Sequence, residues 1–535
     1  MAPGARDRGR DRRPAHPDPW PAGPARWGRG LRGDVVTESS RRALRLALWA
    51  QRQAHVVPKP LRRVAGRTLR RFTKPDAATA GPSEDWSVPL VPGRGAGDLE
   101  ALQPVSAGTL PPAPPPTVEV VESERVRCAI AAGVLDVGGA EEVAAFLARR
   151  LPAHNVETAV VYSDTRLPGQ EGEGGRLARS LAAEGIATHQ LTPDDAGVWM
   201  RSWRPDVISA HNARDWLLDV AAEIGVPWVE TLHDMHRFYH PHSWAPERER
   251  ARRVAAQVAV SDLVRQQYLA RIPTYPGDRV VTVPNGVDGS RVPLVDRARA
   301  RAALGLADEF LFVSLARYCL QKNTYGLVTA FAEVAAEHPD AHLLVAGRAD
   351  DDLLYYEQTR QAAASVPVAD RIHLRGHCAN PAALLAAADA FVLDSFFEGW
   401  SLASMEALVA GVPVVMTDVG GAREQLAAGR RGHLVANPAG SAELVDWQVI
   451  NDLRYRPQGN RADLVAAMSS MVRDRTAWAD ARERLRDEAT ETFSPAASLA
   501  GHAAVLRAVA LGRPLPIRAF SGEPGRSGGD PAPLG

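Results

Sequence analysis

Short apolar runs alternate with longer amphipathic stretches from residue 125 onward, and this alternation dominates the chain. Five runs form a first series, at residues 128–132, 156–162, 207–210, 228–232 and 280–283. Five more form a second series, at residues 310–316, 342–347, 372–374, 390–394 and 412–416. Short buried runs separated by helical patterns predict parallel strands that are covered by helices on both faces. The pattern therefore predicts an α/β protein with two doubly wound domains, joined near residues 288–293. Ligands of such sheets bind beyond the carboxyl ends of the strands, here in a cleft between the domains.

The first 123 residues lack this alternation. Residues 1–35 and 76–117 are rich in Pro, Gly and charge, which predicts disorder or an extended linker. Residues 1–75 carry 19 Lys and Arg against 5 Asp and Glu, although the whole chain has 63 of each kind. Residues 37–73 mix arginines with leucines, a composition typical of short basic helices that bind an anionic membrane surface. A solvated basic tail is the alternative. Nucleic-acid binding is not expected, because no recognised fold surrounds the patch.

Length and cysteine content limit the compartment and the class of protein. A chain of 535 residues exceeds what one hydrophobic core supports. Cys128, Cys319 and Cys378 are few and widely spaced, which favours reduced thiols over disulfides or a zinc cluster. No apolar run reaches the ~18 residues of a membrane span, and the Arg/Pro-rich start lacks the apolar core of a secretion signal. We expect a soluble cytoplasmic protein, and residues 37–73 leave open a peripheral position on the inner face of the membrane.

The segment of residues 398–415 carries the most informative chemistry. Glu398 and Glu406 stand eight positions apart across a loop that leads from a predicted strand into a predicted helix. Free backbone N–H groups and the helix dipole make such a loop an anion cradle. Because a carboxylate in the cradle would repel phosphate, both acids are expected to accept hydrogen bonds from hydroxyl groups. A ligand with both phosphate and hydroxyls is a nucleotide-sugar.

Two further strand ends carry groups that suit phosphate. Gly138 and Gly139 follow the first strand and precede a helix, where glycine lets backbone N–H groups approach a phosphate. A simple turn is the alternative reading. Arg317 and Lys322 flank a polar loop after the strand at residues 310–316. Arginine offers a fork of donors and lysine a point charge, so the pair suits a diphosphate, with ordinary surface charges as the alternative.

Histidines after the run at residues 228–232 raise the alternative of a metal site. His233, His236, His240 and His242 are close in sequence, but Pro241 interrupts a regular helix and no further ligands complete a set. No metal is therefore predicted. A single histidine at a strand end, His233, better fits contact with a sugar hydroxyl.

Other polar residues near strand ends have structural readings. His211 and Asn212 follow a predicted strand and are expected to be satisfied structural groups. The three aspartates at residues 350–352 suit the start of a helix better than a metal. Asp418 precedes Gly420 and Gly421, which we expect to form a second turn that lines the cleft.

With these residues in place, the chain resembles the retaining glycosyltransferases of the GT-B fold, specifically family 4. Glu398 and Glu406 match that family's Glu-x7-Glu motif. The resemblance covers about residues 125–510 in collinear order. The remaining matches are Gly420, Gly421 and Glu424 (GG-x-x-E), Arg317 and Lys322, residues 138–141 (GGAE), His233 (T-x-H-D) and residues 284–288 (PNGVD).

The resemblance implies a role for each matched residue. Glu398 would contact hydroxyls of the donor sugar, and Glu406 the nucleotide ribose. Arg317 and Lys322 would neutralise the departing pyrophosphate, and His233 would bind the transferred sugar. Such enzymes need no divalent metal or other cofactor, because cations and helix N-termini supply the positive charge. The other implied donor-binding positions are Gly138, Gly139, Gly399, Trp400, Ser401, Leu402 and the backbone at Gly376 and His377, which would meet the base.

The resemblance also implies how the chain is divided. A basic extension (1–123) would precede an acceptor-side domain (124–290), a nucleotide-sugar domain (291–492), a helix that crosses back (493–512) and a disordered tail (513–535). Three features depart from the family pattern. Trp400 stands where the loop usually carries Phe, and could reshape the sugar pocket. A polar insertion occupies residues 439–460, and the extension has no family counterpart.

The expected function is transfer of a hexose-type sugar from a nucleotide-diphosphate-sugar to an acceptor hydroxyl, with retention of anomeric configuration. The acceptor would be a glycan, a lipid-linked molecule or a small molecule. The alternatives are a nucleotide-sugar epimerase or a glycan phosphorylase of the same architecture, or a degenerate transferase domain that serves as a scaffold for a membrane or protein partner. A phosphorylase needs a C-terminal lysine for pyridoxal phosphate, and Lys322 is the only lysine after residue 125.

Overall fold

A computed structural model describes residues 81–105, 125–136, 138–163, 175–235, 244–287, 291–349 and 353–516. Residues 79–535 form one compact unit. The predicted basic helices at residues 37–73 lie outside the described residues. So do His236, His240 and His242, and the three aspartates at residues 350–352.

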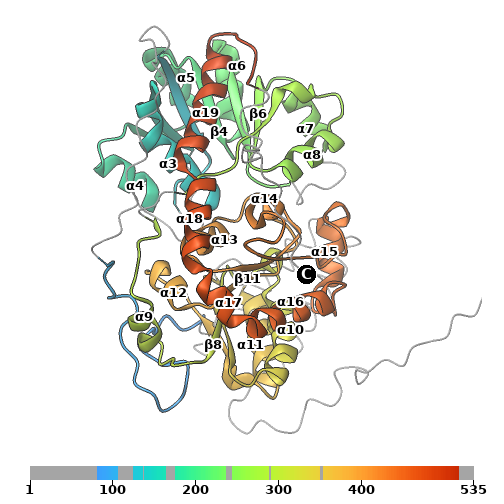
Figure 1. The fold of residues 1–535 in the computed structure, drawn as a ribbon. Coiled ribbons are helices and arrows are strands. Elements are labelled where there is room, and N and C mark those ends of the chain that lie inside the picture. The colour runs from blue at the N-terminus through green and yellow to red at the C-terminus, as the bar shows by residue number, and fades with distance from the viewer. Residues whose placement is uncertain are drawn as a thin grey trace, which may run out of the picture. The chain divides into compact units, whose positions relative to one another are not determined.

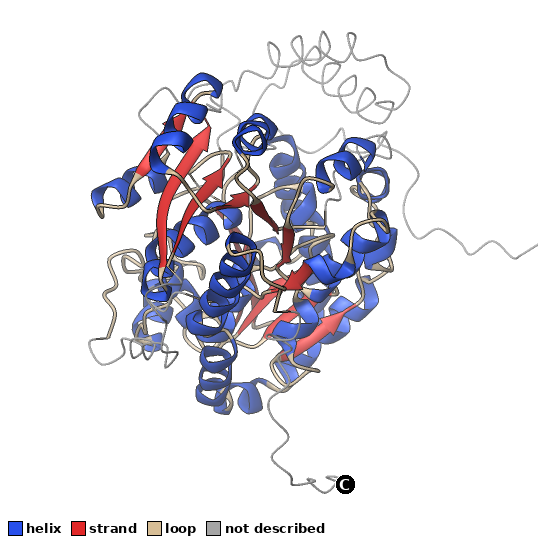
Figure 2. Ribbon diagram, turned by 90° about the horizontal axis from the view of Figure 1, so that it is seen from above, coloured by secondary structure: helices blue, strands red, loops and turns tan. Residues whose placement is uncertain are grey.

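The N-terminal domain is built on a sheet whose described strands all run parallel, in the order β3-β2-β1-β4-β5-β6-β7. β1 lies inside the sheet, with Cys128 opposite both Thr158 of β2 and Val207 of β4. Helices cover both faces of the sheet (Figures 1 and 2). The strands are β1 (Val126–Ala132), β2 (Val156–Ser163), β3 (Thr188–Leu191), β4 (Val207–His211), β5 (Trp228–Leu232), β6 (Ala256–Ala259) and β7 (Val280–Thr282). The helices are α3 (Gly139–Arg150), α4 (Arg176–Ala183), α5 (Pro193–Trp203), α6 (Asp215–Ile224), α7 (Trp244–Ala251) and α8 (Asp262–Arg271).

The C-terminal domain repeats this architecture with strands in the order β10-β9-β8-β11-β12-β13, again parallel throughout the described part. The strands are β8 (Phe310–Leu315), β9 (Ala341–Ala346), β10 (Ile372–Arg375), β11 (Ala390–Leu393), β12 (Val414–Thr417) and β13 (Gly432–Val435). The helices are α9 (Arg297–Ala303), α10 (Thr324–Glu337), α11 (Leu353–Ser365), α12 (Pro381–Ala387), α13 (Leu402–Val409), α14 (Ala422–Leu426), α15 (Trp447–Leu453), α16 (Arg461–Arg473), α17 (Arg475–Asp480) and α18 (Arg482–Thr492). The two sheets confirm the predicted pair of doubly wound domains.

The last helix, α19 (Pro495–Ala510), belongs to the N-terminal domain by its packing. Leu499, Ala503 and Leu506 share one apolar cluster with Val143 and Leu147 of α3. Figure 1 shows α19 alongside the N-terminal sheet, directly after α18 has left the C-terminal domain. The chain thus returns to its first domain to complete the core of that domain.

Each predicted apolar run coincides with a strand, but β3, β6 and β13 carry no such run. β3 reads THQL, and it lies at the edge of the sheet, where side chains are less buried. β6 reads AQVA, and its Gln257 is fully buried. The Gln257 amide N–H donates to the Tyr268 hydroxyl at 2.9 Å, whereas its buried amide oxygen has no hydrogen-bond partner among the described residues.

Residues 81–105 correct the prediction that residues 76–117 are disordered or an extended linker. This segment, which we call the N-terminal strap, packs on the C-terminal domain. Trp86, Leu90 and Leu99 are buried there, at 4%, 2% and 0% exposure. Burial of such side chains contributes about 1.5–3 kcal/mol each, which offsets the entropy lost when an irregular segment is ordered. Three apolar anchors therefore outweigh the surrounding Pro- and Gly-rich composition.

The strap also hydrogen-bonds the edge of the sheet. Ser83 pairs with Arg375 in a parallel bridge beside β10, and the Gly376 N–H donates to the Ser83 carbonyl at 2.7 Å. Trp86 Nε1 donates to the His377 carbonyl at 3.1 Å. The strap therefore covers the open edge of β10, which would otherwise present unpaired backbone groups.

The polar insertion at residues 439–460 folds back on the C-terminal domain. The Gln458 and Asn323 side chains exchange two hydrogen bonds of 2.8 Å. Asn460 and Asn323 each donate to the Asp394 carboxylate, at 2.8 and 2.7 Å. Asp394, at the end of β11, is 1% exposed, and burial raises its pKa to about 7. The insertion thus closes a buried polar cluster beneath the loop that carries Glu398.

Candidate functional site

Loops at the carboxyl ends of strands from both sheets meet at one place. A Cβ atom added at Gly399, in the loop after β11, would overlap the backbone carbonyl of His233, which follows β5. A Cβ at Gly139, at the start of α3, would lie 3.8 Å from the Leu402 side chain of α13. The Asp262 N–H of α8 donates to the Glu424 carboxylate of α14 at 2.9 Å. The structure therefore brings the predicted motifs of both domains together.

Glu398 and Lys322 form an ion pair in this site. Lys322 Nζ lies 2.6 Å from Glu398 Oε1, and the two side chains are 17% and 8% exposed. The Ser395 hydroxyl donates to the same Glu398 oxygen at 2.7 Å. The loop is held by buried Phe396 and Phe397. We expected Glu398 to contact sugar hydroxyls and Lys322 to contact the diphosphate. In the structure their opposite charges are paired with each other.

Glu406 is paired as well, with a residue that sequence reasoning missed. Arg291 Nε lies 2.9 Å from Glu406 Oε1 of α13, and Arg291 Nη1 lies 2.7 Å from Glu142 Oε2 of α3. Burial raises the pKa of Glu406, and the positive charge of Arg291 opposes that rise. A pocket of about 30 Å³ lies beside this bridge, lined among others by Phe146 and Met405. Arg291 thus links the two domains at the carboxylate predicted to bind ribose.

The glycine turn before α3 is covered by an acid of its own motif. A Cβ at Gly138 would overlap the carboxylate of Glu141. Burial raises the pKa of Glu141, and the nearby positive charge of Arg317 opposes that rise. Arg317 from the C-terminal domain and the turn from the N-terminal domain therefore share one electrostatic environment, with a carboxylate between them.

His233 is joined to a second histidine. His211 Nδ1, at the end of β4, lies 2.9 Å from His233 Nε2. Burial lowers the pKa of His233 to about 4, and burial followed by the neighbouring imidazole lowers that of His211 well below its ordinary value. Both rings are therefore neutral near pH 7.

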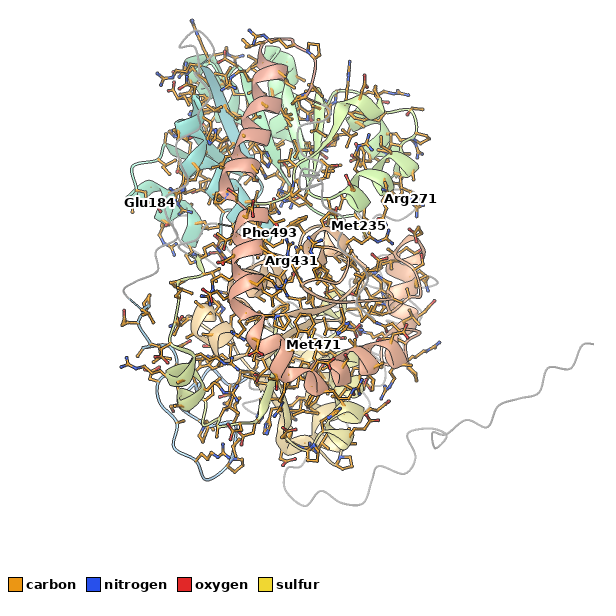
Figure 3. The ribbon with its side chains drawn as sticks, in the orientation of Figure 1. Glu184, Met235, Arg271, Arg431, Met471 and Phe493 are labelled. Carbon is orange, nitrogen blue, oxygen red and sulfur yellow. The ribbon has the colours of Figure 1, made fainter. Side chains whose placement is uncertain are left out.

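Trp400 does not offer its ring to a sugar pocket. The side chain is 7% exposed, and a Cβ added at Gly421 would overlap its ring. The indole N–H donates to the sulfur of Met405 at 3.3 Å, and the ring meets Phe493 edge-on at 6.0 Å. Phe493 lies at the junction of α18 and α19 (Figure 3). The Trp400 side chain therefore packs beneath the loop, between the turn at Gly421 and the end of α18.

The predicted base-binding backbone is already engaged. The N–H of Gly376 and the carbonyl of His377 both bond the N-terminal strap, which sequence reasoning had left out of the site. A nucleotide base that binds at this loop would therefore contact the other groups of the loop or the N-terminal strap.

The second glycine turn, at Gly420 and Gly421, packs against the loop that carries Glu398 and Gly399. Gly420 adopts a left-handed conformation with φ 45°, where other residues are strained. The Gly421 N–H donates to the Gly399 carbonyl at 2.9 Å, and Asp418 is held by Arg423 at 2.6 Å. Among the described residues, no group of three or more His, Cys, Asp or Glu side chains could hold a metal ion.

Comparison with known proteins agrees with this arrangement. A family model described as glycosyl transferases group 1 matches residues 296–463, and one described as glycosyltransferase family 4 matches residues 137–291. The D-inositol 3-phosphate glycosyltransferase of Segniliparus rotundus is 30% identical over 329 residues, which cover 54% of this chain and 71% of that protein. The chain belongs to the group 1 glycosyltransferases.

Two further proteins match, one over a smaller share of its length and one in fold alone. A glycogen synthase of Mycobacterium tuberculosis (strain ATCC 25618 / H37Rv) is 30% identical over 278 residues, and the match spans 48% of this chain and 61% of that enzyme. The crystal structure of a glycosyltransferase from Rickettsia africae superposes with a TM-score of 0.54 at 16% identity, over 72% of this chain and 98% of that one. This likeness shows the GT-B fold. Across the described part of the glycosyltransferase, no helix has the length and apolar character to cross a membrane.

Proposed function

We propose that this glycosyltransferase moves a hexose-type sugar from a nucleotide-diphosphate-sugar to an acceptor hydroxyl, with retention and without a metal ion. The observation that carries the proposal is the Lys322–Glu398 ion pair, 2.6 Å long. It places the only lysine after residue 125 beside a carboxylate at the carboxyl ends of neighbouring strands β8 and β11.

Donor binding would rearrange this pair. A diphosphate brings negative charge to Lys322 and Arg317, and Glu398 is then released to accept hydrogen bonds from sugar hydroxyls. The two cations stabilise the diphosphate as it leaves, which is where charge develops in the transition state. The free N–H groups at the starts of α3 and α13 add positive potential, so a metal is not required for that task.

The proposed mechanism has no side chain that acts as a covalent nucleophile. Retention would therefore result from attack by the acceptor itself. With Glu398 engaged by hydroxyls, the acceptor hydroxyl would attack on the face from which the diphosphate departs, through an oxocarbenium-like state. His233 would hold the transferred sugar, and Glu406, once released from Arg291, would bind the ribose.

The test begins with a thermal-shift screen of the full chain against nucleotide-sugars, since a ligand that binds only the folded protein raises its melting temperature. Transfer is then followed with the stabilising donor, with and without chelator, and the anomeric configuration of the product is read by NMR. Glu398→Gln and Lys322→Ala should each lower kcat by about 10²–10³-fold. The exposed ion pair of Glu357 with Arg360, 2.8 Å long, supplies matched control variants, Glu357→Gln and Arg360→Ala. Near-normal transfer by either site variant would refute the assignment.

A further inference from the structure

A chain of hydrogen bonds runs from the N-terminal sheet to His233. Ser209 and His211 are two positions apart on β4, so their side chains lie on the same face of the strand. Ser209 Oγ lies 3.0 Å from His211 Nε2, and His211 Nδ1 lies 2.9 Å from His233 Nε2. The ring planes of the two histidines are tilted by 40° with centroids 5.1 Å apart, so the contact is a hydrogen bond between ring edges, not a stack.

The inner part of this chain is sealed from solvent. Ser209 is 1% exposed and His211 2%, whereas His233 is only half-buried. Both imidazoles are neutral, for the reason given above, and each therefore carries a single N–H. The position of that proton decides which ring atom of His233 donates and which accepts.

Two proton arrangements are compatible with the distances. In one, His211 donates Nε2–H to Ser209, and its Nδ1 accepts from His233 Nε2–H. The Ser209 hydroxyl proton then has no acceptor among the described residues. In the other, the Ser209 hydroxyl donates to His211 Nε2, and His211 donates Nδ1–H to His233 Nε2. A buried donor without a partner costs about 1–3 kcal/mol, so the second arrangement is favoured.

We infer that Ser209 and His211 hold His233 in the tautomer that carries its proton on Nδ1. His233 Nε2 is then occupied by His211, and Nδ1–H is the ring group left for a ligand, with no partner among the described residues. The ligand atom that meets His233 must accept a hydrogen bond, as the oxygen of a sugar hydroxyl does. His211 is a positioning residue, since it acts through His233.

This inference deepens the proposed function, because it rests on His233 contacting the transferred sugar. It assigns a task to His211, for which the sequence suggested only a structural role. It also narrows the substrate chemistry, because His233 in this tautomer cannot accept a hydrogen bond from a sugar hydroxyl. Specificity at this contact would thus depend on an oxygen that is free to accept.

The tautomer can be measured without any substrate. The full chain is labelled with ¹⁵N-histidine, and a long-range ¹⁵N–¹H correlation spectrum is recorded near pH 7, with His233 assigned by its loss in His233→Gln. We expect a pyridine-type Nε2 and a pyrrole-type Nδ1 for His233. The opposite pattern in the wild-type chain would overturn the inference.

Two isosteric substitutions test whether His211 is responsible. In His211→Asn the side-chain amide can place its N–H where Nδ1–H stands, so the His233 pattern should persist. In His211→Gln the amide reaches the position of Nε2 and bonds Ser209 only, so the His233 signals should move to a mixture of tautomers. Identical His233 spectra in the two variants would contradict the assignment.

Two further variants cover the possibility of misfolding. Ser209→Ala removes the donor to His211 Nε2 with little change in packing, and should mix the tautomers of both rings. His502 on α19 is 1% exposed and close enough for its charge to act on both rings, yet no hydrogen bond joins it to either within the described residues. His502→Gln should therefore leave the tautomer pattern of His233 unchanged. If His502→Gln altered that pattern and Ser209→Ala did not, α19 and not Ser209 would control the tautomer of His233.

Kinetic measurements distinguish a failure of this inference from a failure of the proposed function. Donor hydrolysis is measured with whichever of UDP-glucose, ADP-glucose or GDP-mannose stabilises the chain. His211→Gln should lower kcat/KM about tenfold relative to His211→Asn, as expected for one misdirected hydrogen bond. If the spectra were as expected but no sugar were transferred, only the proposed function would be refuted. If both variants transferred sugar at equal rates, only the role of His211 would be refuted.

Discussion

The buried carboxylate of Asp394 makes the stability of the C-terminal domain depend on pH in an unusual direction. Its pKa is raised by burial from 3.8 to about 7. Between these values the folded protein holds the proton more tightly than the unfolded chain does. Stability is therefore greatest on the acid side and falls as the pH rises through this window. From pH 5 to pH 8 the loss from this residue is about 3 kcal/mol.

Asp394→Asn removes the charge and should remove this loss. The new amide can accept from Asn323, and Asn460, whose Oδ1 is buried without a partner, can rotate its amide to accept from it. The rearrangement costs about 1 kcal/mol. The variant should therefore be less stable than the wild type by about that amount at acid pH and more stable by about 2 kcal/mol at pH 8.

Calorimetry at pH 5 and pH 8 tests this expectation, with attention to the transition of the C-terminal domain. A gain of 2 kcal/mol corresponds to roughly 4–8 °C for a domain of this size. Asp487→Asn, the same change at an exposed position of α18, is the control and should show no dependence on pH relative to the wild type. If Asp394→Asn were destabilising by equal amounts at both pH values, the argument from burial would be refuted.

Two further predictions concern contacts that sequence reasoning did not reveal. Trp86→Ala should destabilise the C-terminal domain by about 3–5 kcal/mol in urea unfolding, and Trp86→Phe by much less, since it loses mainly the bond to His377. Equal melting of Trp86→Ala and the wild type would show that the strap is dispensable. Gly399→Ala should lower sugar transfer about 10²-fold, because its methyl group would push the loop off the His233 carbonyl. Gly459→Ala, which has room for a methyl group, is the control, and equal rates for the two variants would contradict the closeness of this contact.

The sequence was a good guide to the fold because burial leaves a clear mark on parallel strands. Runs such as residues 412–416 are apolar on both faces, and helices cover both faces of the strands they form. β3 and β6 escaped notice for physical reasons. An edge strand needs little apolar surface, and the buried Gln257 of β6 donates a hydrogen bond to Tyr268, a partner that no local pattern shows.

The candidate site was predicted in its members but not in its pairings. Glu398, Lys322, Glu406 and the glycine turns stand at strand ends, which the order of elements reveals. That Arg291 would hold Glu406, or that Lys322 would hold Glu398, depends on distances across 115 and 76 residues of sequence. Such partners are set by tertiary packing, and a single sequence carries no record of them.

The strap was missed because composition averages over a window. Residues 76–117 are rich in Pro and Gly, yet Trp86, Leu90 and Leu99 decide their structure. Three well-placed anchors outweigh many residues that favour disorder. The matches to the family models begin at residue 137 and therefore do not include the strap.

The strap and α19 together interlock the two domains along the chain. The C-terminal domain begins with residues 81–105, before the N-terminal domain has been synthesised, and the N-terminal domain is finished by α19, after the C-terminal domain is complete. Neither domain is a continuous stretch of sequence, so no single cut releases either one whole. On the ribosome, the apolar face of the N-terminal domain that receives Leu499 and Leu506 stays uncovered until α19 has emerged. The two domains must therefore complete their folding together, once α19 has been synthesised, and not one after the other.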